Sequence, residues 1–328
     1  MASATARGFL AALILCASFL LSSDALALDA GDTLRVMTFN VRGCTDETGE
    51  RNVAQTANRI LTENPDVCGI QECNDARSAE LASATGLHRY FHHDEAILSK
   101  EEALSVEVVD LLYYQTYHRD LMIAEFEDYI IANTHMSQTS EYGLPEVDVI
   151  TNALAKYEGK GKPILFMGDL NTRPGFKVYN KLAPLMQCIS PINMADGEGT
   201  YCSETNADGE YTWNWILDFI YMDFASARSG EWSWTSHVVK DHITSDHAPV
   251  VADITYLGPY KYIHSGWPPE NPSYSAASSP LSDFESGGYR TEVSETAVSL
   301  EARIRTWQES IGTRLRSDKA SGIFIHLR

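Results

Sequence analysis

Polar residues with catalytic potential recur in this sequence where short apolar runs end. A buried scaffold can hold such residues rigidly, as functional side chains require. A single Asn after a strand is most often a turn residue, and a single Asp-His pair most often lies at the surface. A recurring set therefore favours one shared function over separate accidents. The set comprises six points in chain order, namely Asn40, Gln71-Glu72, His135, Asp169 with Asn171, Asp218, and Ser245-Asp246-His247.

The residue types predict acid–base chemistry beside a hard metal ion. The carboxylates of Glu72 and Asp246 and the amide oxygen of Asn40 are ligands suited to Mg²⁺ or Mn²⁺. No Cys/His spacing in the sequence suggests zinc. The two histidines, His135 and His247, are of the type that exchanges protons near neutral pH.

Two further carboxylates belong to the set. Asp169 and Asn171 form an Asp-x-Asn pair whose tight turn could hold a water and a substrate oxygen side by side. Asp218 lies within the apolar run 215–220, where a carboxylate is costly unless it is paired. We therefore expect Asp218 to have a partner.

Alternating strands and helices must position these residues. Helices are expected at 50–63 and at about 145–158, because their apolar residues recur with helical spacing. Mixed strands with helices between them indicate an α/β fold in which helices cover β-sheets. The expected strands are 34–40, 66–71, 96–99, 105–113, 121–126, 128–134, 163–167, 215–222, 234–239 and 249–255.

These stretches resemble a known family. The matching segments run in the family's order and are 34–42, 65–72, 134–135, 168–171, Asp218 and 245–247. The region 31–256 is thus similar to the endonuclease/exonuclease/phosphatase superfamily typified by deoxyribonuclease I. The resemblance implies two mixed β-sheets packed face to face with helices on the outer faces, a four-layer sandwich. It also implies a catalytic domain that hydrolyses phosphodiester bonds with a divalent metal.

The resemblance assigns roles around the metal and the attacking water. Glu72 would be the principal ligand of Mg²⁺ or Mn²⁺, helped by Asn40 and Asp246. Asp169 would orient or deprotonate the water, and Asn171 would hold the phosphate and its developing charge.

The remaining roles concern the phosphate and the leaving group. His247, oriented by Asp218, would sit at the scissile phosphate. His135 would protonate the leaving oxygen or contact the phosphate from the other side. Arg119 matches a phosphate-binding position of nuclease-like members. The alternative, that Arg119 is a surface residue at the edge of a strand, is weighted equally. Glu95 is the nearest candidate for an acid that pairs with the residue at His135, and its competitors are 92–94.

Composition limits the class of protein and the substrate. The chain has 328 residues, 44% hydrophobic and 21% charged, which argues against a disordered chain, a collagen-like fibre and a polytopic membrane protein. The formal net charge is −20, and 35 acidic against 16 basic residues lie in 31–256. This acidity does not help to grip a polyanion, although Arg42, Arg119 and Arg173 could hold one or two phosphates.

Three functions remain open at this point. A nuclease-type phosphodiesterase acting on DNA or RNA is favoured. A lipid or small-molecule phosphoesterase, sphingomyelinase- or inositol-phosphate-like, is the first alternative, because aromatic residues cluster around 213–215 and 232–234. A non-catalytic binding module on the same fold is the second, and the filled catalytic positions argue against it.

Both ends of the chain differ from the central block. Residues 1–27 have the early cation, the short apolar core and the Ala-x-Ala site of a secretory signal peptide. This predicts a secreted protein, or a periplasmic one if it is bacterial, without a stable membrane span. Residues 257–289 form a Ser/Pro/Gly-rich linker, and 290–328 an amphipathic helix and tail. The apolar stripe over 293–315 would pack on the main domain, bind a partner or self-associate.

Export permits disulfides. Cys188 and Cys202 flank a Gly- and Asp-containing loop and are the favoured pair, and Cys44 with Cys73 could form a second. Cys68 lies in an apolar strand and is expected to be a buried thiol.

Overall fold

The computed structural model describes residues 28–45, 49–111, 118–193, 199–205, 211–240 and 244–259. The predicted signal peptide (1–27), the linker from residue 260 onward and the predicted helix at 293–315 lie outside the described residues. Among the residues described, no helix is both long and apolar enough to span a membrane.

The first sheet has six strands in the order β13-β14-β1-β2-β4-β3. Its central strands β1 and β2 are parallel, and the other neighbouring pairs are antiparallel. The strand bounds are β1 Thr33–Asn40, β2 Val67–Gln71, β3 His88–His92, β4 Glu95–Ser99, β13 Trp232–Val238 and β14 Val250–Tyr256.

The second sheet repeats this plan with six strands in the order β5-β6-β7-β8-β12-β9. Here β7 and β8 form the parallel pair. The strand bounds are β5 Ser105–Asp110, β6 Asp120–Glu125, β7 Ile130–His135, β8 Ile164–Asp169, β9 Met186–Cys188 and β12 Asp218–Asp223. A separate two-stranded hairpin is formed by β10 (Tyr201–Thr205) and β11 (Tyr211–Trp215).

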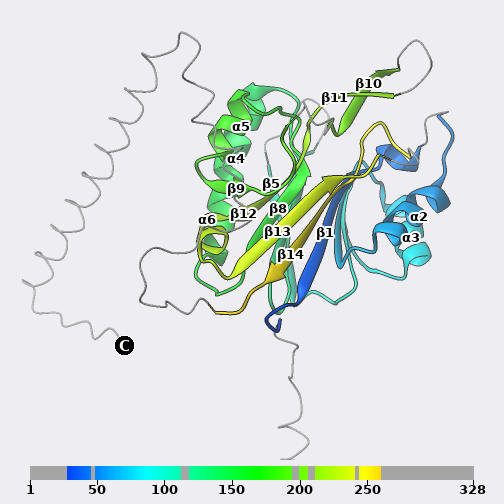
Figure 1. The fold of residues 1–328 in the computed structure, drawn as a ribbon. Coiled ribbons are helices and arrows are strands. Elements are labelled where there is room, and N and C mark those ends of the chain that lie inside the picture. The colour runs from blue at the N-terminus through cyan, green and yellow to red at the C-terminus, as the bar shows by residue number, and fades with distance from the viewer. Residues whose placement is uncertain are drawn as a thin grey trace, which may run out of the picture. The chain divides into compact units, whose positions relative to one another are not determined.

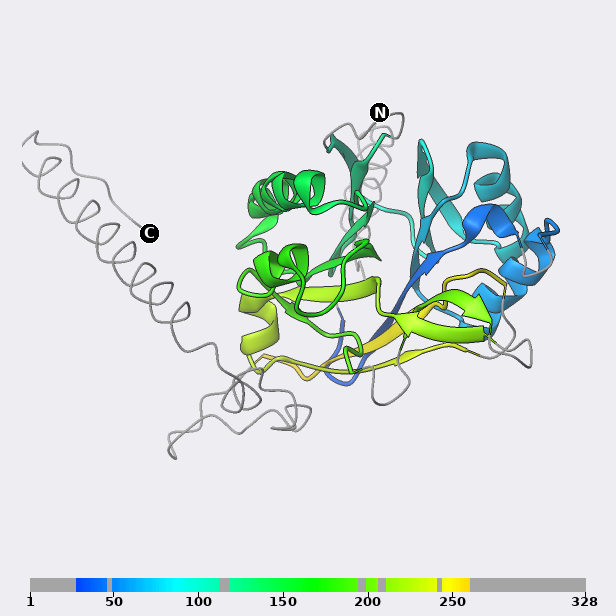
Figure 2. The same cartoon turned by 90° about the horizontal axis from the view of Figure 1, so that it is seen from above.

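Alternating side chains build three apolar layers. In β1, Val36 faces the second sheet while the next residue, Met37, faces the helices on the outside, because successive strand residues point to opposite faces. Figures 1 and 2 show the two sheets face to face with α2 and α3 outside one and α4 and α5 outside the other. The predicted α/β sandwich is therefore confirmed. The helix bounds are α2 Val53–Glu63, α3 Asp75–Thr85, α4 Ser140–Leu154, α5 Lys177–Leu182 and α6 Phe224–Arg228, with 3₁₀ turns at Arg42–Cys44 and Ala155–Tyr157.

The sheets come close together where the parallel strands approach their carboxyl ends. Within the second sheet, a Cβ on Gly168 of β8 would lie 1.9 Å from the carbonyl oxygen of Thr134 on the neighbouring strand β7, and Gly168 also has a φ of +149°. A Cβ on Gly69 would lie 2.3 Å from the side-chain oxygen of Asn133, which belongs to the other sheet. These glycines let the strand ends that carry the polar residues lie within hydrogen-bonding reach of each other.

The expected Cys188–Cys202 disulfide is wrong. All five described cysteines are free thiols. Cys188 lies on β9, where its Sγ contacts the side chain and carbonyl of Ser190, whereas Cys202 lies on the β10–β11 hairpin. Cys44 and Cys73 are not bonded either, but they are in contact, and hydrogen bonding from Cys73 lowers the pKa of Cys44. Cys68 is a buried thiol, as expected.

Candidate active site

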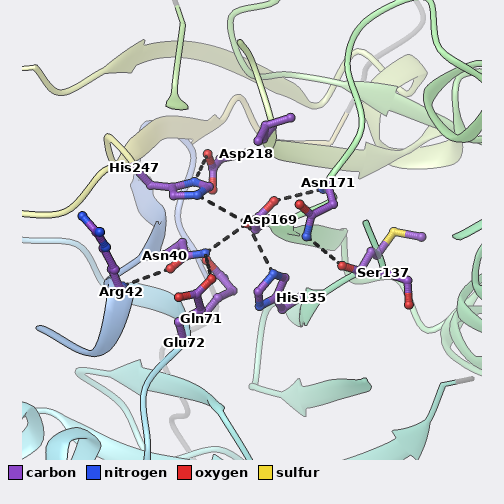
Figure 3. Close-up of polar contacts among 12 residues, drawn as sticks. Asn40, Arg42, Gln71, Glu72, His135, Ser137, Asp169, Asn171, Asp218 and His247 are labelled. Carbon is purple, nitrogen blue, oxygen red and sulfur yellow. Dashed lines mark hydrogen bonds and ion pairs between the residues drawn. The ribbon is translucent and has the colours of Figure 1, made fainter. Parts of the chain in front are cut away.

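The carboxyl ends of the two parallel strand pairs form the base of the site. Asn40 ends β1 and Glu72 follows β2, while His135 ends β7 and Asp169 ends β8. Because the sheets pack face to face, the four ends meet at one edge. The Asn40 amide joins them, since its Nδ2 donates to Glu72 Oε1 and to Asp169 Oδ2, both at 3.0 Å (Figure 3).

Asp169 lies at the centre of this arrangement. It is almost fully buried, and its Oδ1 accepts a hydrogen bond from the Asn171 backbone at 2.9 Å. Its Oδ2 lies 3.5 Å from His135 Nε2 and 3.7 Å from His247 Nε2. Burial raises the pKa of Asp169 above its ordinary value, while the nearby His247 opposes that rise. The carboxylate is therefore poised to accept a proton.

Asp218 has the partner that we expected, and that partner is His247. His247 Nδ1 lies 2.9 Å from Asp218 Oδ2, and the Asp218 side chain is fully buried. Burial alone would lower the pKa of His247, but the carboxylates of Asp218 and Asp169 outweigh it and raise that pKa to about 10. The ring therefore carries a positive charge at neutral pH.

Thr200 orients Asp218 through the same carboxylate oxygen that contacts His247. Its hydroxyl donates to Asp218 Oδ2 at 2.6 Å and accepts from the backbone N–H groups of Leu217 and Asp218. The residue is fully buried. Sequence reasoning missed Thr200, because a Thr in an irregular segment between strands carries no distinguishing pattern.

Glu72 and Asp246 are the carboxylates that fit a divalent cation. The φ of Glu72 is +54°, a left-handed conformation rare outside glycine, and its exposed side chain lines the site's cavity. Asp246 lines the same cavity and lies 3.5 Å from Arg42 Nε. These two carboxylates line one cavity with Asp169, and carboxylate oxygens are the ligands that Mg²⁺ or Mn²⁺ prefers; the closest group of potential ligand atoms here is formed by Asp169, Asp218 and His247.

Asn40 has a different orientation from the one expected of a ligand. Its Oδ1 accepts a hydrogen bond from the Arg42 backbone at 3.0 Å, so its amide nitrogen is the atom that faces Glu72 and Asp169. In this arrangement Asn40 positions the two carboxylates. A ligand role for its oxygen stays a prediction.

His135 and Glu95 lie together behind Asp169. Glu95 is fully buried and its Oε1 accepts from the His135 backbone N–H at 2.8 Å. The second oxygen of Glu95 and the Nδ1 of His135 are both buried without a hydrogen-bond partner. Burial lowers the pKa of His135 well below its ordinary value, and Arg119 adds to this effect, so the ring is neutral. Of the candidates at 92–95, Glu95 is thus the residue that contacts His135.

Arg119 is buried beside this pair. Its Nη1 lies 3.4 Å from Asp94 Oδ2, and its side chain is only 5% exposed. It does not line the cavity that Glu72 and Asp246 share. Contact between Arg119 and a phosphate would therefore require a side-chain rearrangement, and that role stays a prediction.

Asn171 presents its amide at the opposite wall of the site. Its φ of +47° places it in the left-handed region, and its Nδ2 donates to the Met136 carbonyl at 2.8 Å. The backbone N–H of Asn171 is bonded to Asp169, as a tight Asp-x-Asn turn requires. The sequence-based expectation that this pair shares one turn is consistent with this geometry.

A cavity of about 750 Å³ opens above these residues. One wall is aromatic and cationic. Arg173 lies between the rings of Phe176 and Trp215, with its guanidinium carbon 4.0 Å and 4.9 Å from the two ring centroids. Tyr201 stacks on Trp215 and also contacts the ring of His247, with centroids 4.8 Å apart. Sequence analysis singled out Arg173 and the aromatic residues at 213–215, but it did not place them together or include Tyr201 and Phe176.

Comparison with known proteins identifies the family of the chain. The model of the Endonuclease/Exonuclease/phosphatase family matches residues 37–247. No curated protein matches the chain.

Solved structures share the fold at low sequence identity. A family protein from Bacteroides thetaiotaomicron is 15% identical, with a TM-score of 0.56, and the match covers 69% of this chain and 98% of that one. A mannosyl-6-phosphatase from the same species is 14% identical, with a TM-score of 0.56 and coverage of 68% and 100%. TDP2 from C. elegans is 16% identical, with a TM-score of 0.52 and coverage of 72% and 78%.

The family match spans most of the described region and every metal-site and acid–base position discussed above. The chain therefore belongs to the Endonuclease/Exonuclease/phosphatase family and is a metal-dependent hydrolase of phosphate esters.

Proposed function

We propose that this enzyme is a phosphodiesterase that cleaves nucleic-acid-type substrates by attack of water on phosphorus. The observation that carries the proposal is the contact of one buried carboxylate, Asp169, with two histidines of different charge beside the cavity. A carboxylate of raised pKa suits a general base, and a cationic imidazole suits a group that stabilises a phosphoryl oxygen.

The side chains divide the chemistry between them. Asp169 would accept a proton from the attacking water as the new bond to phosphorus forms and the bond to the leaving oxygen breaks. His247, held by Asp218, would donate a hydrogen bond to a phosphoryl oxygen. The lowered pKa of His135 supports contact with the phosphate through a neutral ring more than protonation of the leaving oxygen. Asn171 would position the substrate oxygen.

A divalent cation held by Glu72 and Asp246 would supply further electrostatic stabilisation of the phosphoryl charge. The choice of Mg²⁺ or Mn²⁺ rests on the hard oxygen donors of these carboxylates. Asn40 would keep Glu72 and Asp169 in place during turnover, since its amide nitrogen bonds to both.

The aromatic wall supports a nucleotide as the substrate. Trp215 is 40% exposed and Phe176 is 50% exposed, so both present ring surface to a bound ligand. A nucleobase stacked on such a ring gains about 1–3 kcal/mol. Arg173, which lies between these rings, offers a positive charge to an adjacent phosphate.

The strong acidity of the chain argues for a short contact with the nucleic acid. A net charge of −20 opposes a long phosphate track, since binding many phosphates depends on local cations. We therefore propose that recognition is confined to one or two nucleotides at the cavity.

A matched pair of substrates tests this proposal. Thymidine 5′-(p-nitrophenyl phosphate) and methyl p-nitrophenyl phosphate share the leaving group and differ in the nucleoside. We expect Trp215→Ala to raise KM for the thymidine ester by about 5- to 160-fold, the range that corresponds to loss of one stacked base, and to leave the methyl ester nearly unchanged. Trp215→Phe should restore most of the difference.

Equal effects of Trp215→Ala on both esters would contradict base stacking. The exposed rings of Trp215 and Phe176 also favour a second candidate, a phospholipid substrate, because they could contact acyl chains. Release of choline phosphate from sphingomyelin, without hydrolysis of DNA, RNA or the thymidine ester, would select that candidate.

We also propose that the protein is exported, either secreted or delivered to a periplasm. The support is the signal-peptide pattern of residues 1–27. N-terminal sequencing of protein recovered from outside the cytoplasm should begin just after Ala27, and an intact N-terminus there would contradict the proposal.

A further inference from the structure

A second group of metal-binding side chains lies apart from the phosphoesterase residues. His92 ends β3, His93 begins the turn to β4, and Asp120 begins β6. The Nδ1 atoms of the two histidines lie 3.1 Å and 2.5 Å from the same oxygen, Asp120 Oδ2. The three potential ligand atoms lie within 4.8 Å of one another. Each of these residues is absent from the walls of the catalytic cavity.

The turn that follows β3 brings these two rings together. Neighbouring residues of a strand point to opposite faces, so consecutive histidines would normally diverge. His93 instead lies in the two-residue turn between β3 and β4 and has the positive φ, +45°, that such hairpin turns use. The turn therefore lets both rings reach Asp120.

Asp120 is the least accessible member of the group. Its side chain is only 2% exposed, and its Oδ1 is buried without a hydrogen-bond partner. A buried carboxylate oxygen without a donor is costly, and a cation in contact with the carboxylate would remove that cost. Asp110 lies directly opposite Asp120 in the β5–β6 register and adds negative charge at the same end of the sheet.

The rings of His92 and His93 remain open to solvent. Their side chains are 36% and 41% exposed, so an ion could reach them without unfolding of the protein. The ring of His118 stacks on His93 with centroids 4.5 Å apart, and this contact fixes the plane of the His93 imidazole.

We propose that His92, His93 and Asp120 form a binding site for a transition-metal ion of the Zn²⁺ class, separate from the catalytic cation. Two imidazole nitrogens and one carboxylate oxygen are a common donor set for Zn²⁺ and Ni²⁺, whereas Mg²⁺ and Ca²⁺ prefer oxygen ligands alone. Coordination through Nδ1 would place the proton of each neutral imidazole on Nε2, and the two hydrogen bonds to Asp120 would give way to a three-residue coordination sphere. Further positions would be left to water.

The site was not visible in the sequence, which shows no zinc-type Cys/His spacing. Asp120 is 27 residues beyond His93, a separation that matches no metal-binding motif. The tertiary fold creates the site by placing the β3–β4 turn beside the start of β6.

Zinc titration of the full-length protein, purified without a polyhistidine tag and stripped with EDTA, tests the proposal. Isothermal titration with ZnCl₂ is performed in a Glu72→Gln background, so that loss of a principal catalytic ligand suppresses the other site. We expect one equivalent of Zn²⁺ to bind. The His92→Ala/His93→Ala double variant should bind it at least ~10-fold more weakly, because direct ligands matter at least as much as their outer-shell partners.

His88→Ala is the matched control, since His88 is an exposed histidine at the other end of β3. It should retain the wild-type zinc affinity. In the same Glu72→Gln background, Zn²⁺ should also raise the Tm of the parent protein and of His88→Ala but not that of the double variant, whose fold is checked by circular dichroism. Equal zinc binding by the double variant, or no zinc binding by the Glu72→Gln protein, would overturn the proposal. Neither readout depends on phosphoesterase activity.

Discussion

Replacement of Asp218 by Asn should change the charge of His247. In the wild type the pKa of His247 rises from 6.5 to about 10, which corresponds to roughly 5 kcal/mol in favour of the protonated ring. Asp218 contributes the nearest carboxylate, 2.9 Å away, and both side chains are buried. Without that charge, burial dominates and lowers the pKa of His247. The ring of the variant should therefore be neutral at pH 8.

The same shift makes a prediction about stability. Between pH 6.5 and about 10 the folded protein holds a proton on His247 that the unfolded chain releases. The stabilisation is therefore complete below pH 6.5 and is lost as the pH rises towards 10. This contribution should fall by up to ~1.4 kcal/mol for each pH unit in that window. Asp218→Asn should remove most of the slope.

Three measurements on Asp218→Asn test this reasoning. Ring NMR signals of His247 in EDTA-treated protein should remain those of an imidazolium from pH 6 to 9 in the wild type and become neutral above about pH 7 in the variant. Urea unfolding at pH 7 and pH 9 gives the stability slope. The value of kcat/KM for a phosphodiester should fall at least ~10²-fold, the scale of losing a positioned acid or base.

Asp253→Asn is the matched control, because Asp253 forms a partly exposed ion pair with Arg35 elsewhere on the first sheet. It should leave the His247 signals and the rate unchanged. An imidazolium signal that persists in Asp218→Asn at pH 9, together with a wild-type rate, would refute the assigned role of Asp218.

Two further substitutions give distinct outcomes. Glu72→Gln should raise the Mg²⁺ or Mn²⁺ concentration needed for half-maximal activity by at least ~10-fold, whereas Glu102→Gln on the exposed surface should not, and equal requirements would argue against Glu72 as a ligand. Gly168→Ala should reduce the free energy of unfolding by at least ~2 kcal/mol in urea titrations, because its Cβ meets the Thr134 backbone. Gly159→Ala, left-handed but with open space around its Cβ, should cost only ~1 kcal/mol, and similar losses for both would contradict the close backbone contact between β7 and β8.

The central strands could be predicted because both sheets bury both of their faces. Residues 34–40 and 163–167 are nearly continuous apolar runs that end in polar residues, and this pattern predicts both the strand and the position of its functional end. The packing of the two parallel pairs then brings Asn40, Glu72, His135 and Asp169 together.

Other elements were harder to predict, because their apolar residues do not recur with a regular spacing. Helix α3 was missed because small residues dominate it, and only Ser78 and Leu81 are buried. Its N-terminal signal was Asn74, whose side chain accepts a hydrogen bond from the Arg77 backbone. Helix α4 begins at Ser140, five residues before the predicted start, because Pro145 lies within the helix instead of opening it.

The parts of the site that the sequence did not predict depend on tertiary contacts. Thr200 and Tyr201 reach Asp218 and His247 from the segment that leads into the β10–β11 hairpin, whose short and irregular register has no period-2 signal. Trp215 and Phe176 lie on one wall of the cavity, on either side of Arg173. Such pairings follow from the folded chain and not from spacing.

Hydrolysis of a phosphodiester in H₂¹⁸O tests the central claim most directly. The wild-type enzyme, supplied with Mg²⁺ or Mn²⁺, should place one ¹⁸O atom on the phosphoryl product, because Asp169 directs water to phosphorus. Asp169→Asn should form this product at least ~10²-fold more slowly while keeping its fold. Label in the alcohol product, or a wild-type rate for Asp169→Asn, would contradict the account.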